Sequence, residues 1–119
     1  MRKFVSLAGM LGALTLAVAG PAYAHAKLTA AEPAANATVA APREIVLRFN
    51  EKMVGSFSGF DLTSADGAKV AVKTAVGKDG MSMVGVPAKP LAKGVYKVAW
   101  HAVTADSHRM QGDFSFTVR

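Results

Sequence analysis

Histidine dominates the possible chemistry of this chain, which has three histidines and no cysteine. His25 directly follows Ala22-Tyr23-Ala24, a small-x-small tripeptide that is typical of signal peptidase sites. Cleavage after Ala24 would make histidine the first residue, so that an α-amine and an imidazole would belong to the same residue. These two groups together form a bidentate chelate for a metal ion such as copper or zinc.

The first 24 residues have the three parts of a secretory signal peptide. Two basic residues precede an apolar run over 7–19, which is shorter than the roughly 20 residues of a membrane span. We therefore predict that 1–24 is a cleaved signal peptide and that 25–119 is one mature periplasmic domain. An uncleaved N-terminal anchor is the alternative.

A second pair of candidate ligands lies near the end of the chain, where Asp106 and His108 are two residues apart. In an extended stretch, side chains at i and i+2 point the same way, so these two groups could converge. With the amine and ring of His25 they would supply three nitrogens and one oxygen, a set that suits Cu(II). Zinc would take the same groups tetrahedrally. A turn-capping Asp106 and an exposed loop His108 are the alternative interpretations.

Composition excludes several other functions. The absence of cysteine removes disulfides, thiolate metal sites and thiol nucleophiles. Without the signal peptide, 12 basic residues face 8 acidic ones, and the lysines are spread singly along the chain. Nucleic-acid binding would need a basic stripe with interleaved aromatic residues, and the sequence has none.

Alternating hydrophobicity predicts short strands and no amphipathic helix. The strongest patterns cover 43–50, 94–103 and 113–119, and weaker ones cover 58–63, 69–76, 81–86 and an edge strand near 27–30. This is typical of a seven-stranded antiparallel immunoglobulin-like (Greek-key) β-sandwich, with a small closed barrel as the alternative. Within 94–103 the alternation places Trp100 in the core and His101 on the opposite, exposed face.

Four features of the mature chain resemble the CopC/PcoC family of periplasmic copper-binding, copper-resistance proteins. They are the start His25-Ala26-Lys27-Leu28, the Pro33 turn, the run Leu47-Arg48-Phe49-Asn50-Glu51, and Trp100 through His108 with Gly112 and a Phe-rich last strand. Val-Thr-Ala-Asp-Ser-His, which ends at His108, is similar to the family signature V-S-A-D-x-H. The resemblance implies one Cu(II) per chain, bound by the amine and ring of His25, by His108 and by Asp106 as oxygen or near-axial ligand. Glu51 matches a family acid that contacts the terminal amine.

The resemblance also implies a role in copper homeostasis, in which the protein sequesters copper or passes it to an inner-membrane transporter of the CopD type. Many relatives have a methionine-rich Cu(I) loop, but the four mature methionines here form no M-x-x-M cluster, so we expect a single Cu(II) site and no Cu(I) site. Affinity for Cu(II) should fall as the pH is lowered, because the amine and the imidazoles must be unprotonated to bind the metal. We expect no enzyme activity. The alternatives are a small copper redox enzyme of the histidine-brace type and an immunoglobulin-like interaction module.

Overall fold

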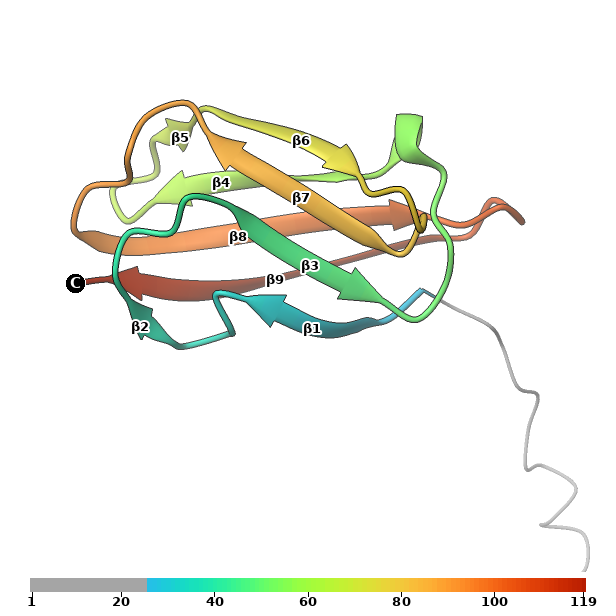
Figure 1. Ribbon diagram of the computed structural model, residues 1–119, viewed down its shortest axis with the longest axis horizontal. Coiled ribbons are helices and arrows are strands. Elements are labelled where there is room, and N and C mark those ends of the chain that lie inside the picture. The colour runs from blue at the N-terminus through green and yellow to red at the C-terminus, as the bar shows by residue number, and fades with distance from the viewer. Residues whose placement is uncertain (1–25) are drawn as a thin grey trace, which may run out of the picture.

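The computed structural model describes residues 26–119, which fold into two facing β-sheets (Figure 1). The first sheet has the order β1 (Leu28–Glu32), β3 (Ile45–Phe49), β7 (Ser82–Pro87), β6 (Val72–Val76). The second has the order β2 (Thr38–Val39), β9 (Arg109–Val118), β8 (Gly94–Val103), β4 (Gly59–Ser64), β5 (Lys69–Val70). One 3-10 helix, η2 (Gly55–Phe57), follows β3. The predicted all-β sandwich is confirmed.

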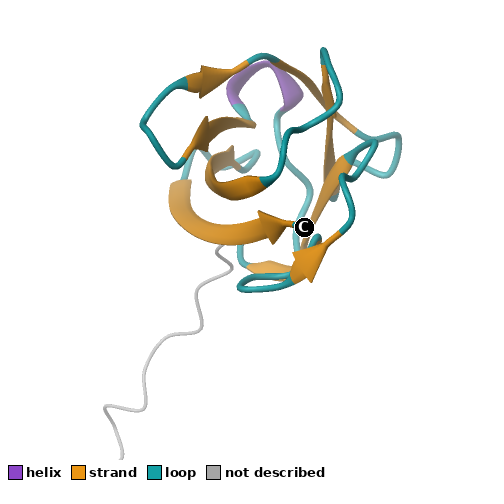
Figure 2. Cartoon of the chain, turned by 90° about the vertical axis from the view of Figure 1, so that its left-hand side faces the viewer, coloured by secondary structure: helices purple, strands orange, loops and turns teal. Residues whose placement is uncertain are grey.

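The core lies between the sheets because each long strand turns alternate apolar side chains inward. In β3 these are Ile45, Leu47 and Phe49, none of which is more than 3% exposed. The inward side chains of β8 and β9 meet them from the other sheet. Among these, the rings of Tyr96 and Phe116 stack with their centroids 5.7 Å apart. Figure 2 shows the two sheets wrapped around this interior, seen along the strands.

The strand count differs from the predicted seven, because nine strands form within residues 26–119. The predicted strand 69–76 is divided at Ala71, since β5 pairs with β4 in one sheet while β6 pairs with β7 in the other. Both pieces keep a valine against the core as the chain crosses between sheets. The two-residue β2 is too short to show any alternation, and it pairs parallel with β9, whereas the prediction was purely antiparallel.

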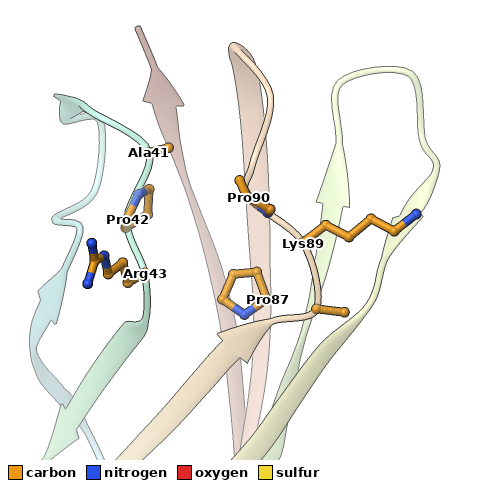
Figure 3. A pocket seen from close by; sticks show the side chains of 7 residues that line it. Ala41, Pro42, Arg43, Pro87, Lys89 and Pro90 are labelled. Carbon is orange, nitrogen blue, oxygen red and sulfur yellow. The ribbon is translucent and has the colours of Figure 1, made fainter.

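The two ends of the sandwich differ in chemistry. The end with the C-terminus carries a depression between residues 41–43 and 87–90, which is lined mainly by proline and alanine together with Arg43 and Lys89 (Figure 3). None of these residues is a histidine or an acid, so this hollow supplies no metal ligand. The β8–β9 turn and the beginning of the described chain lie at the opposite end (Figure 1).

No helix within residues 26–119 is long and apolar enough to cross a lipid bilayer.

Candidate metal centre

A tight turn between β8 and β9 carries Asp106 and His108. The turn is closed by two backbone hydrogen bonds, from Thr104 N–H to His108 O (3.0 Å) and from Ser107 N–H to Thr104 O (2.9 Å). Ser107 adopts a left-handed conformation with φ of 72°. Asp106 and His108 therefore converge through a turn, and the extended geometry expected from their i, i+2 spacing was wrong.

The Asp106 carboxylate contacts His108 directly. Its Oδ2 lies 2.9 Å from Nδ1 of His108, while its Oδ1 accepts from the Thr104 hydroxyl and, at 3.4 Å, from the His108 backbone N–H. These side chains are 57% (Asp106) and 53% (His108) exposed. The turn thus presents one carboxylate and one imidazole together on the surface.

Hydrogen bonding keeps Asp106 ionised. The Thr104 hydroxyl, followed by the hydrogen bonds from His108, lowers the pKa of Asp106 to about 2. An ionised carboxylate can only accept hydrogen bonds, so Nδ1 of His108 must donate to it. In the neutral ring of the metal-free protein, this places the lone pair on Nε2.

Glu51 contributes a buried acceptor at the same end of the sandwich. Within the described residues its Oε2 is buried and has no hydrogen-bond partner. The neighbouring Asn50 accepts from the Lys27 backbone N–H at 2.8 Å and donates its own N–H to Lys27 O at 3.2 Å. Asn50 thus fixes Lys27 near the beginning of the described chain, where Ala26 is 1% exposed, and Glu51 is the next residue after Asn50. A buried carboxylate oxygen without a donor is costly, which is typical of a site that awaits a ligand or partner.

Aromatic packing fixes this end of the two sheets. Trp100 faces the interior and meets Phe49 edge to face, with ring centroids 5.0 Å apart. A Cβ at Gly112, which lies opposite Trp100 on β9, would be 2.7 Å from the indole ring, so only glycine fits there. The predicted core position of Trp100 is confirmed, although its ring remains partly exposed.

His101 lies on the outer face of the same sheet and is half-buried, where we had expected full exposure. It is paired with Gly59 and Gln111 across neighbouring strands. Asp61 and Asp113, which line the same depression as His101, form ion pairs with lysines at 3.7 and 3.9 Å. Among residues 26–119, no metal cluster includes His101.

The structure brings together two of the three predicted ligands. Asp106 and His108 are in contact, whereas His25 lies outside the described residues and its role stays a prediction. Within 26–119, no group of three or more His, Cys, Asp or Glu side chains could hold a metal. Sequence reasoning missed Thr104, whose hydroxyl holds Asp106. The available signal was its position: Thr104 lies two residues before Asp106 and continues the alternation of β8, in which every second side chain points inward.

Three of the four methionines in residues 26–119 serve packing. Met53 and Met83 are buried in the core, and Met110 packs against it. Thioethers often fill irregular core space in this way.

Comparison with known proteins identifies relatives of the whole domain. Residues 28–119 match the CopC domain. Copper resistance protein C is 41% identical in Escherichia coli, covering 92% of this chain and 94% of the relative, and 43% identical in Pseudomonas syringae pv. tomato, covering 98% and 95%. The crystal structure of PcoC, a methionine-rich copper resistance protein from Escherichia coli, superposes with a TM-score of 0.76 at 42% identity, covering 81% of this chain and all of that one. The chain belongs to the CopC family.

Proposed function

We propose that the mature protein begins at His25 and captures one Cu(II) ion in the periplasm. The ligands would be the amine and ring of His25, the ring of His108 and the carboxylate of Asp106. The observation that carries this proposal is the contact between Asp106 and His108 on an exposed turn. Residues 1–24 would be the signal peptide that is removed to expose the amine.

Family membership supports a copper-binding role in resistance or transport, because the relatives from Escherichia coli and Pseudomonas syringae pv. tomato are both named copper resistance protein C, and a Bacillus subtilis relative is named a copper transport protein. Nitrogen and carboxylate ligands favour Cu(II), whereas methionine thioethers would suit Cu(I), and Met53, Met83 and Met110 are packed in or against the core. The buried, unpartnered oxygen of Glu51 supports a positively charged or hydrogen-bonding group beside it, and the terminal amine has that chemistry.

Exposure of the turn favours transfer of the metal as well as storage. Both side chains are more than half exposed, so an acceptor can replace them one ligand at a time without unfolding the domain. We therefore include delivery to an inner-membrane transporter of the CopD type in the proposed role.

Copper titration of the protein that begins at His25 tests this function. We expect one Cu(II) per chain and an electron paramagnetic resonance spectrum with nitrogen hyperfine structure. The His101→Ala variant is the matched control, because it removes a histidine from the outer face of β8 and should leave the spectrum unchanged. A stoichiometry near zero, or a spectrum with no nitrogen ligation, would refute copper capture. Peroxide formation with ascorbate above the level of free copper would favour the redox-enzyme alternative.

Substitution Glu51→Gln should weaken Cu(II) binding by about 10-fold, since loss of a group that orients a ligand commonly costs 10–100-fold in metal affinity. Glutamine keeps the side-chain shape but removes the negative charge that would favour and orient the amine. Competition with a chromophoric chelator measures the change. Glu44→Gln is the control, because Glu44 is exposed and precedes β3 at the other end of the sandwich. Equal affinities for both variants would exclude a role for Glu51.

A further inference from the structure

Thr104 is a buried polar residue at the base of the exposed turn. It is 3% exposed and immediately follows β8, where an isolated bridge pairs it with Met53. Its backbone N–H and carbonyl oxygen both close the turn. The backbone of Thr104 is therefore held from two sides, so its hydroxyl has a fixed position beneath Asp106.

The hydroxyl of Thr104 has two acceptors within reach. It contacts Oδ1 of Asp106 closely and lies 3.4 Å from the carbonyl oxygen of His108. A hydroxyl has a single proton to donate, and an ionised carboxylate is the stronger acceptor. Oδ1 of Asp106 is therefore anchored to the buried frame of the sandwich.

Anchoring one carboxylate oxygen determines where the other can go. With Oδ1 held by Thr104, rotation of the carboxylate is restricted, and Oδ2 stays 2.9 Å from Nδ1 of His108. That contact in turn orients the imidazole and selects its tautomer. A chain of hydrogen bonds thus runs from the core through Thr104 and Asp106 to the histidine ring.

We propose that Thr104 is a positioning residue for metal capture, a role that rests on the proposed copper function. Its hydroxyl anchors Asp106, whose carboxylate holds the ring of His108 in the metal-free protein, so that both side chains are already placed together on the turn when the metal arrives. The buried hydroxyl, rather than the size of the side chain, is the feature that matters. Valine has nearly the same shape as threonine but no hydroxyl, whereas serine keeps the hydroxyl and lacks the methyl group. The two substitutions therefore separate hydrogen bonding from packing.

The first arm of the test uses the metal-free protein. Nitrogen NMR of the His108 ring at about pH 8, above the ordinary imidazole pKa of about 6.5, should show the proton on Nδ1 in the unaltered protein and in Thr104→Ser. In Thr104→Val it should show a mixture of the two tautomers. Thermal denaturation of all three proteins verifies that they are folded. A single, unchanged tautomer in Thr104→Val would overturn the proposal, as would Thr104→Ser behaving like Thr104→Val.

The second arm measures Cu(II) affinity by competition with a chelator, using chains that begin at His25. Thr104→Val should bind Cu(II) about 10–100-fold more weakly, as expected for loss of a group that orients a ligand, and Thr104→Ser should bind like the unaltered protein. Equal affinities for Thr104→Val and the unaltered protein would overturn the proposal. Failure of the unaltered protein to bind copper would refute the proposed function instead, while the tautomer measurement would still judge the role of Thr104 in orienting His108.

Discussion

A precursor-like chain that retains residues 19–24 before His25 is expected to bind Cu(II) more than about 100-fold more weakly than the chain that begins at His25. The extension converts the α-amine of His25 into a peptide nitrogen, which has no basic lone pair for the metal. Loss of a group that only orients a ligand already costs 10–100-fold, so loss of a directly bonded amine should cost more. Competition titration against a chromophoric Cu(II) chelator gives both affinities.

The same six residues appended after Arg119 provide the matched control. That extension has the same composition but adds to the end of the sandwich that lacks the β8–β9 turn (Figure 1), so affinity should be unchanged. His25→Ala should resemble the N-terminal extension, because it removes the ring half of the chelate. If the N-terminal extension binds Cu(II) as tightly as the chain that begins at His25, the terminal amine is not a ligand and the proposed site is wrong.

The strands that sequence reasoning predicted best are those buried on one face. In β8, Tyr96 and Val98 are buried while Lys97 between them is exposed, so the period of two is plain in the sequence and the predicted bounds of 94–103 match the structure. In β2 only two residues pair, and no period can be read from two residues. The division of 69–76 was also hidden, because the valines on either side of Ala71 both pack against the core, although they lie in different sheets.

The meeting of Asp106 and His108 was predicted from the sequence, but the geometry that produces it was not. Asp106 and His108 were selected by residue type and spacing, and they do meet. Ser107 between them is left-handed, and the hydroxyl of Thr104 donates to Asp106; neither feature has a signal in residue type alone. Non-glycine residues seldom adopt positive φ, so the sequence favoured an extended segment here.

Gly85→Ala is expected to lower the free energy of unfolding by about 3 kcal/mol. Gly85 lies in β7 between Ile45 and Thr74 of the neighbouring strands. A Cβ there would be 2.2 Å from Cζ of Phe60 in the opposite sheet and 2.8 Å from Cγ1 of Val72. Both neighbours are packed into the core, so the methyl group could enter only by forcing the two sheets apart.

Urea denaturation followed by the fluorescence of Trp100, the single tryptophan of the chain, measures this cost. Gly55→Ala is the control, because a Cβ at Gly55 would make an ordinary 3.6 Å contact with Val76 at the surface. Its effect should not exceed about 1 kcal/mol in either direction, including the entropy that alanine removes from the unfolded chain. If Gly85→Ala unfolds at the same urea concentration as Gly55→Ala with an unchanged slope, the sheets are not in close contact at Phe60.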